Sequence, residues 1–328
     1  MSRNATTATI GYFGKVPGRG DFVKGGDSPA LIKVLDDWLA QAMDLMSADA
    51  RWKLNYDAVA PLHFAFVGPR RRHAIAGHII ASSDQSQRRF PFLMTSSVEV
   101  AEPGSFVPTA PLVFNRLWNR LATLSSSVVG AGDPTVPLQL AASEAIELDL
   151  RSAAYQASFD DFLELQTIGG LDGLLAQAGF KGSSRQVLLA LGMLLQPVLA
   201  SSSSRLDKTL LLPLPQDPMY RNLVAAFWLH LITPFLARAD FELALFVTRQ
   251  REQPVLLVGF SGASPATLHG IMDPQAAREQ HIAFEELDWV EEHADSDYAI
   301  KKLSTYLSQP TLSLKSALDS VSAAFIGT

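Results

Sequence analysis

The sequence predicts an α+β fold in which largely antiparallel sheet is covered by helices. Three short runs rich in β-branched and aromatic residues follow one another closely, at Pro61–Val67, His73–Ser82 and Phe90–Val100. The connections between them are too short for crossover helices, which indicates neighbouring antiparallel strands. Segments with helical spacing lie on both sides of these runs, and 48% of the 328 residues are hydrophobic, enough for a sizeable core.

The chain begins with an expected strand, loop and helix. Ile10–Gly14 predicts a short strand, and Lys15–Asp21 is a loop dense in Gly and Pro. Ser28 and Pro29 predict the N-cap and first position of a helix. The apolar residues that recur along this helix are Leu31, Val34, Leu35, Trp38, Leu39, Ala42 and Met43. After the three strands, a helix with Leu112, Leu117, Leu121 and Leu124 on one side closes a first unit.

The segment Ser125–Pro137 is rich in Ser, Gly and Pro and predicts a linker. We therefore expect two mixed α/β units, at residues 1–126 and 138–328, with the second packed on the first. Expected helices of the second unit are Ala142–Leu165, Ser184–Leu199, Asp217–Leu236, Ser264–Met272 and Tyr298–Leu307. Expected strands are Thr209–Leu214, Phe241–Thr248 and Pro254–Phe260, and Ser201–Ser204 predicts a break.

Composition excludes several classes of function. The formal charge is −6, so the protein as a whole repels nucleic acid, and the absence of cysteine excludes disulfides, thiolate metal sites and cysteine nucleophiles. The N-terminus does not have the pattern of a signal peptide. The most apolar stretch, Leu223–Leu236, is interrupted by Pro234 and falls short of the roughly 20 apolar residues that cross a bilayer. These observations predict a cytoplasmic protein without membrane insertion.

One motif suggests nucleophilic catalysis. Gly259–Ala263 places Ser261 between an expected strand and an expected helix, and Asp273 and His281 follow in the order found in α/β-hydrolases. Ala263 stands where that motif has Gly, and too little chain follows for further parallel strands. The other interpretation is a strand–turn–helix connection with Ser264 as N-cap. A serine hydrolase that uses Ser261 is kept as an alternative function.

No motif predicts a cofactor or a metal. The glycine-rich start contains neither a GxxxxGK[ST] nor a GxGxxG frame, and Pro17 removes a backbone N–H that a phosphate cradle would use. His73 and His78 are an odd number of residues apart, which places them on opposite faces of a strand. The acidic segment Glu285–Asp297 matches no pattern of metal ligands and is typical of a solvated helix end.

Two basic loops, Arg70–His73 and Arg88–Arg89, flank the expected strands. They could bind an acidic or phosphorylated protein, or they could be the ordinary charges that keep sheet edges soluble. Nucleic acid is disfavoured as a partner because no aromatic stacking platform accompanies these charges.

Three groups of residues, taken together, resemble the TagF (ImpM) family of accessory proteins of bacterial type VI secretion systems. The first is Gly11–Val23, which contains the aromatic–Gly-Lys-x-Pro-x-x-Gly-Asp-Phe motif of the family. The others are Trp38 on the first helix and Ser83-Asp84 with Arg89–Phe92. The resemblance covers about the first 100 residues. His63 departs from the family, since a tryptophan-like residue is expected there.

The resemblance implies a non-enzymatic, post-translational repressor that binds a forkhead-associated (FHA) scaffold protein and blocks assembly of the secretion apparatus. An alternative is a structural accessory subunit that docks to the apparatus. Some members carry a fused metal-dependent phosphatase, but the one Asp-Gly pair here, Asp172–Gly173, indicates the stand-alone form without phosphatase activity. The sequence leaves the oligomeric state open.

The matching motifs supply the candidate site residues. Candidate partner contacts are Lys15, Arg19, Asp21, Asp84, Arg88 and Arg89, and the structural signature is Gly14, Pro17, Gly20, Phe22, Trp38, Phe90 and Pro91. Two interpretations of the first loop stay open. It is either a scaffold in which Lys15 or Arg19 pairs with Asp21, or a contact surface in which Arg19 is an exposed donor. Phe90–Phe92 predicts a core strand, and Pro91 indicates an edge position.

Overall fold

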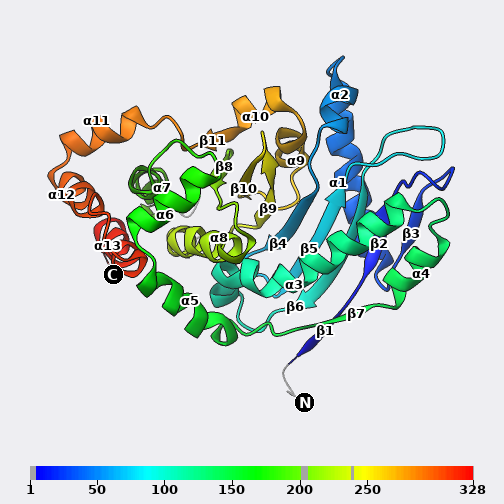
Figure 1. The fold of residues 1–328 in the computed structure, drawn as a ribbon, viewed down its shortest axis with the longest axis horizontal. Helices are drawn as coiled ribbons and strands as arrows, with labels where there is room; N and C mark the ends of the chain where they lie inside the picture. The colour runs from blue at the N-terminus through cyan, green and yellow to red at the C-terminus, as the bar shows by residue number, and fades with distance from the viewer. Residues whose placement is uncertain (1–4, 201–205, 238–239, 328) are drawn as a thin grey trace.

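The computed structural model describes residues 5–200, 206–237 and 240–327, and its centre is a nine-stranded sheet (Figure 1). The strand order is β11-β8-β10-β9-β4-β5-β6-β2-β3. All neighbours are antiparallel except β11 and β8, which confirms the predicted α+β class with largely antiparallel sheet. The strands are β2 (Gly11–Gly14), β3 (Val23–Gly25), β4 (Leu62–Val67), β5 (His73–Ile80), β6 (Phe92–Glu99), β8 (Thr209–Pro213), β9 (Leu243–Gln250), β10 (Gln253–Gly259) and β11 (His281–Ala283).

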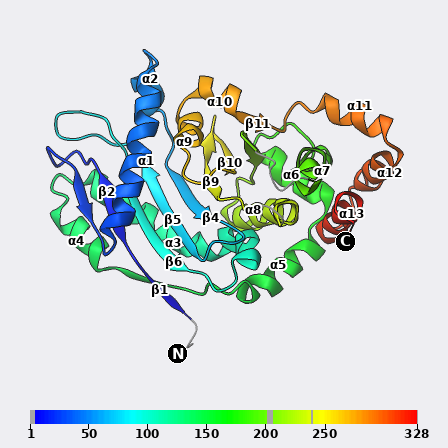
Figure 2. The ribbon, with the colours of Figure 1, turned by 180° about the vertical axis from the view of Figure 1, so that it is seen from behind.

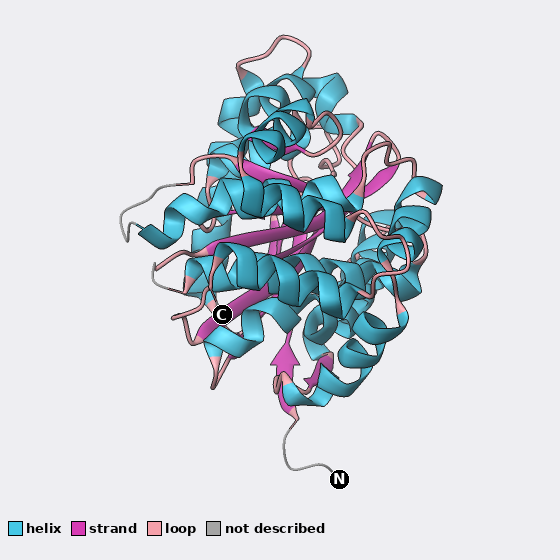
Figure 3. Cartoon of the chain, turned by 90° about the vertical axis from the view of Figure 1, so that its left-hand side faces the viewer, coloured by secondary structure: helices cyan, strands magenta, loops and turns pink. Residues whose placement is uncertain are grey.

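Helices cover both faces of this sheet (Figure 3). Helices α3 (Pro103–Gly130) and α8 (Pro218–Ile232) lie in front of it in Figure 1, and α1 (Pro29–Ser47) lies on the opposite face, seen in Figure 2. Helix α9 (Pro265–Met272) packs beside α1. The other helices are α2 (Trp52–Asp57), α4 (Thr135–Ser143), α5 (Ala153–Leu165), α6 (Ile168–Gln177), α7 (Ser184–Ala200), η1 (Thr233–Leu236), α10 (Pro274–Gln280), α11 (Asp288–Ser296), α12 (Tyr298–Leu307) and α13 (Leu314–Phe325).

The alternation of side chains along β4 produces two separate cores. Phe64 and Phe66 face α1, where their rings lie 5.7 and 5.1 Å from the ring of Trp38. His63 faces the other way and stacks on Trp118 of α3 at 5.5 Å. The imidazole therefore takes the place of the tryptophan-like residue expected there and packs on an indole instead.

The start of α1 agrees with its sequence signals. Ser28 Oγ accepts a hydrogen bond from the backbone N–H of Leu31, and Pro29 occupies the first helical position, as predicted. The prediction that Val34 belongs to the apolar face is wrong, because its side chain is 57% exposed. Ile32 lies on the buried face instead.

The predicted linker Ser125–Pro137 is wrong in its local structure. Helix α3 continues to Gly130 with Ser125 fully buried, and α4 begins at Thr135. The chain before and after this segment builds one sheet, because β4 pairs with β9. The unit boundaries at 1–126 and 138–328 stay a prediction.

The expected single helix Ala142–Leu165 is also wrong. Strand β7 (Ala145–Leu148) interrupts it and pairs with β1 (Thr6–Thr9) in a small second sheet. Ile146 and Leu148 are buried while the residues between and before them are exposed, a period of two that favours a strand. Helices α2, α4, α6, α10, α11 and α13 were not predicted. The expected break at Ser201–Ser204 lies outside the described residues.

Within the described part of the chain, no helix combines the length and the hydrophobicity that a membrane crossing requires.

Candidate functional site: the paired loops

Two loops that are distant in the sequence lie side by side. The signature loop (residues 14–22) follows β2. A turn at residues 83–89 joins β5 to β6, and we call it the acidic turn after its buried residue Asp84. The two together are called the paired loops. The backbone N–H of Gln85 donates to the carbonyl of Arg19 at 2.8 Å, and the Arg88 guanidinium donates to the carbonyl of Gly20 at 2.8 Å. All six candidate contact residues of the sequence are thereby brought to one place.

Asp84 holds the two loops together from the inside. Its side chain is fully buried, and Oδ1 accepts the backbone N–H groups of Ser86 at 2.9 Å and Arg88 at 3.0 Å. Oδ2 accepts from Lys15 Nζ at 3.0 Å and from Arg88 Nε at 2.6 Å. One carboxylate therefore fixes the conformation of the acidic turn and its contact with the signature loop.

The electrostatics of Asp84 favour its charged form. Burial by itself would raise the pKa of this carboxyl, but the Arg88 backbone N–H and the Lys15 and Arg88 side chains hold the pKa well below its usual range. Lys15 is 8% exposed, and its Nζ also lies 5.0 Å from the centre of the Phe22 ring. Lys15 and Asp84 thus form a buried ion pair, and their role in this structure is to position the loops.

Aromatic rings support the signature loop from below. Phe22 stacks on Phe13 with a centroid distance of 5.3 Å and meets the edge of Phe90 at 5.0 Å. Phe90 is 9% exposed, as expected for a core residue, whereas Phe22 is 42% exposed. The loop thus presents one half-exposed aromatic face to solvent.

The expected edge position of Pro91 is wrong. Strand β6 lies between β5 and β2, so it is an interior strand. Pro91 is buried and directly precedes the first strand residue, Phe92. A proline is tolerated there because the missing N–H falls just outside the strand.

Gly14 and Gly20 have different physical requirements. Gly14 has φ 134°, and a Cβ at this position would lie 2.1 Å from the Pro91 carbonyl oxygen. A Cβ on Gly20 would meet nothing closer than 3.9 Å. We expect Gly14→Ala to lower the free energy of unfolding by about 2–4 kcal/mol and Gly20→Ala by less than about 1 kcal/mol. Urea unfolding of both variants measures this difference, and equal losses would contradict the assigned role of Gly14.

The predicted pairing of Lys15 or Arg19 with Asp21 is wrong. Lys15 pairs with Asp84, and the Arg19 guanidinium lies 3.2 Å from Asp133 Oδ1 and also donates to Thr135 Oγ1. Asp21 is exposed, and its carboxylate accepts only the neighbouring backbone N–H of Phe22 among the described contacts, at 2.8 Å. Arg19 is therefore tethered to the segment before α4, from which it is separated by more than 100 residues.

Helix α2 anchors the other end of the acidic turn. Arg89 donates from Nε and Nη2 to the two carboxylate oxygens of Asp57, at 2.7 and 2.6 Å. The Tyr56 hydroxyl is hydrogen-bonded at 2.9 Å to both the N–H and the carbonyl of Ser82. Both ends of the turn are thus fixed by side chains.

The basic loop Arg70–His73 lies at the other end of β5. Arg71 pairs with Asp240 at 3.2 Å and with Glu242 at 3.3 Å, and Arg72 lies 3.7 Å from Glu99. Local acidic residues therefore match these charges, as expected for hairpin-tip residues that keep a sheet soluble.

The candidate contact residues separate into two groups by exposure. The Arg19 and Arg88 side chains are 44% and 63% exposed, and Asp21 is exposed beside them. Lys15 and Asp84 are buried, and Arg89 is held by Asp57. Direct contact with a partner stays a prediction for the exposed group.

Trp38 has a structural position, as its place in the signature suggests. It is 3% exposed, and its Nε1–H donates to the Ser264 carbonyl at 3.2 Å, which ties α1 to the start of α9. Ser264 occupies the expected N-cap position, but its side chain makes no capping bond.

The residues of the hydrolase alternative are not connected to one another. Asp273 is buried and caps α10 through the N–H groups of Gln275 and Ala276, and it also accepts from Asn55 Nδ2 at 2.9 Å. Both ring nitrogens of His281 are buried without a hydrogen-bond partner in the described residues. Ser261 is exposed on the turn after β10. This arrangement is a strand–turn–helix connection rather than an assembled triad.

A buried histidine pair was missed by the sequence analysis. His63 Nδ1 and His78 Nδ1 lie 3.1 Å apart across β4 and β5, and His78 is 3% exposed. His73 is exposed, so the predicted alternation along β5 holds. No group of three or more His or acidic side chains among the described residues is arranged to hold a metal ion.

This chain is similar to a solved structure and to a protein-family model. A crystal structure of PA0076 from Pseudomonas aeruginosa PAO1 is 22% identical with a TM-score of 0.36, and the match covers 43% of this chain and 65% of that chain. No curated protein is significantly similar to this chain. The family model described as TagF N-terminal domain, Type VI secretion system-associated, matches residues 11–144, which include the paired loops. Residues 11–144 of this chain therefore form a TagF N-terminal domain, a domain described as type VI secretion system-associated, as the motifs predict.

Proposed function

We propose that this protein is a cytoplasmic, non-enzymatic repressor of type VI secretion that binds an FHA-domain scaffold protein through the paired loops. The observation that carries the proposal is the combination of exposed side chains at the surface of the paired loops with ion pairs beneath and beside them, of which Lys15–Asp84 is buried. Arg19, Asp21, Phe22 and Arg88 reach solvent from this surface.

This arrangement suits protein binding for a physical reason. Arginine and aromatic side chains are enriched among the residues that dominate binding energy, because they combine large contact area with directional hydrogen bonds. The ion pairs of Asp84 with Lys15 and of Arg89 with Asp57 fix the backbone beforehand. Little conformational freedom then has to be lost on association.

The non-enzymatic part of the proposal is supported by the unconnected positions of Ser261, Asp273 and His281. Asp273 uses its carboxylate to cap a helix and to accept a hydrogen bond from Asn55, and it makes no hydrogen bond to His281 among the described residues.

The proposal predicts that Arg19→Ala weakens capture of the FHA protein of the same secretion system at least about tenfold. Arg72→Ala is the matched control, since Arg72 also forms an exposed ion pair but lies at the opposite end of β5. Exposed pairs contribute little to stability, so both variants should melt close to the wild type. Titration of each purified variant with the FHA protein gives the dissociation constants.

The outcomes separate the hypotheses. Equal capture by wild type and Arg19→Ala would keep the partner and assign the signature loop to the scaffold. No capture by the wild type at micromolar concentration would contradict sequestration and favour the structural accessory subunit. Deleting the gene then gives the matching readout in cells, because losing a repressor raises secretion and losing a subunit abolishes it.

A further inference from the structure

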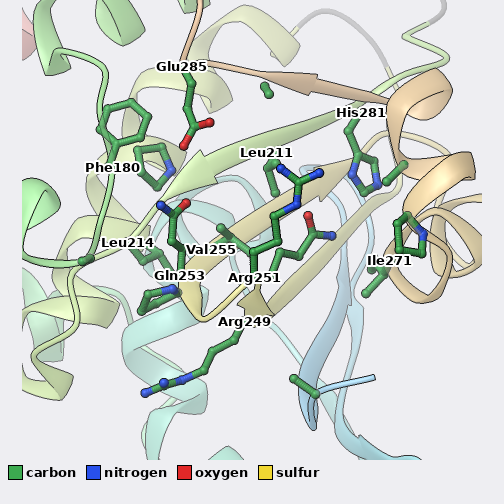
Figure 4. Close-up of a pocket in the computed structure, with 18 of the residues that line it drawn as sticks. Phe180, Leu211, Leu214, Arg249, Arg251, Gln253, Val255, Ile271, His281 and Glu285 are labelled. Carbon is green, nitrogen blue, oxygen red and sulfur yellow. The ribbon is translucent and has the colours of Figure 1, made fainter. Parts of the chain in front are cut away.

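A cavity of about 440 Å³ lies at the β11 end of the sheet and contains none of the paired-loop residues. Its walls come from β8, from the β9–β10 hairpin, and from the chain that runs through α9, α10 and β11 (Figure 4). The end of α2 with the residues that follow it, and the segment around Phe180, complete the lining. A volume of this size is typical of sites for small organic molecules.

The floor of the cavity is apolar. Phe180, Leu211, Val255 and Ile271 line it. Such a surface favours the body of a ligand that loses apolar area to water on binding.

The β9–β10 turn places an arginine in this cavity through an unusual backbone. Gln250 pairs with Gln253, which leaves Arg251 and Glu252 as a two-residue turn with φ 48° and 68°. Turns of this geometry favour Asn-Gly, and left-handed backbone at larger residues is concentrated at functional sites. Figure 4 shows the Arg251 side chain extending into the middle of the pocket, whereas the side chain of Arg249, also a lining residue, extends away from the middle and pairs with Glu252.

Three polar side chains of the cavity, those of Arg251, Arg278 and His281, have no partner among the described residues, whereas Gln253 and Asn55 are hydrogen-bonded. Among the described residues, neither Arg251 nor Arg278, which also lines the cavity, makes an ion pair or a side-chain hydrogen bond. Both ring nitrogens of His281 are buried and unbonded, although buried polar atoms are nearly always paired. Burial lowers the pKa of His281 to about 4, so at neutral pH the ring has one N–H donor and one acceptor.

Glu285 limits the charge of a ligand. Figure 4 shows it on the side of the pocket opposite His281, with Arg251 between them. Besides Arg249, the lining holds the guanidinium groups of Arg251 and Arg278 and the one carboxylate of Glu285, which favours a ligand with a single negative charge.

We propose that this cavity binds a small organic monoanion with an apolar body. Its acidic group meets the Arg251 guanidinium, with Arg278 supporting it at the rim. Its body lies on Leu211, Val255 and Ile271, and a polar substituent reaches the His281 ring. This site is separate from the paired loops and does not depend on the proposed partner.

Calorimetric titration of the full chain with naphthoate and with naphthamide tests the proposal. The two probes have nearly the same shape and differ in charge. We expect naphthoate to bind with a dissociation constant below about 1 mM and naphthamide at least about tenfold more weakly. Arg251→Gln should weaken naphthoate at least about tenfold, and Arg249→Gln, the control from the same hairpin, less than about twofold.

Occlusion of the cavity provides a second test. Ile271→Trp adds volume at the floor and should abolish naphthoate binding in a protein that still melts cooperatively. The proposal is overturned by any of three results: no heat from naphthoate, equal binding of the two probes, or unchanged binding in Arg251→Gln.

Discussion

Asp84→Asn is expected to lower the thermal midpoint of the protein by about 10 °C. The substitution keeps the size of the side chain but leaves the buried Lys15 ammonium without its counter-charge. It also weakens the bond to Arg88 and the acceptors for two backbone N–H groups of the acidic turn. An uncompensated buried charge is among the most destabilising single changes in a folded protein. Circular dichroism melts measure the effect.

Two further variants show whether the unpaired lysine is the cause. Arg88→Gln removes a partner whose side chain is 63% exposed, so the midpoint should change by less than about 3 °C. The double variant Lys15→Met with Asp84→Asn removes the unpaired buried charge of Lys15. It should recover at least half of the decrease in thermal midpoint that Asp84→Asn causes. Two results would contradict the role of the buried ion pair. One is an Asp84→Asn variant with the thermal midpoint of the wild type. The other is a double variant with a lower thermal midpoint than Asp84→Asn.

Acidification from pH 6.5 to pH 5 is expected to reduce the free energy of unfolding by about 3 kcal/mol through His63 and His78 alone. Burial lowers the pKa of His63 to about 3, with help from the charges of His78 and Arg221, and burial lowers the pKa of His78 to about 4. In the unfolded chain both rings take up protons below about pH 6.5. The unfolded state then binds more protons, so this stability is complete above pH 6.5 and is lost as the pH falls toward 4.

The test is the slope of unfolding free energy against pH, measured by urea titration. His63→Phe with His78→Phe should reduce the number of protons taken up on unfolding by about 1.6 on average between pH 6.5 and 5, whatever its effect on overall stability. His73→Gln is the control, because His73 is exposed on the same strand and should leave the slope unchanged. Equal slopes in the wild type and the double variant would show that the buried pair does not cause the acid sensitivity. Asp84 contributes only at lower pH, because its depressed pKa matters below about pH 4.

Local signals in the sequence predicted much of the fold. The three early strands, predicted from short runs rich in β-branched and aromatic residues, and the Ser28-Pro29 helix start both agree with the structure. Strand β7 was missed because four residues are too short to give a clear period of two beside the helical patterns around it. Helix α3 contains Pro108 and Pro111, which usually mark a helix end, so its beginning at Pro103 was not expected.

The candidate site was found as two motifs, but its internal bonding was not. Lys15 and Asp84 were both identified, yet the sequence alone does not show which carboxylate a lysine meets in the folded chain. The partner of Arg19, Asp133, lies 114 residues away and carries no motif. A sequence signal for the cavity was the pair Arg251-Glu252. It forms the two-residue turn between β9 and β10, a position where Asn-Gly is usually favoured.

Hydrogen–deuterium exchange on the complex with the FHA protein tests most directly whether the paired loops are the binding surface. The account predicts slower exchange, relative to the free protein, of the backbone amides of residues 18–22 and 85–88. Protection confined to other segments, such as α11–α13, with unchanged exchange in both loops would contradict it.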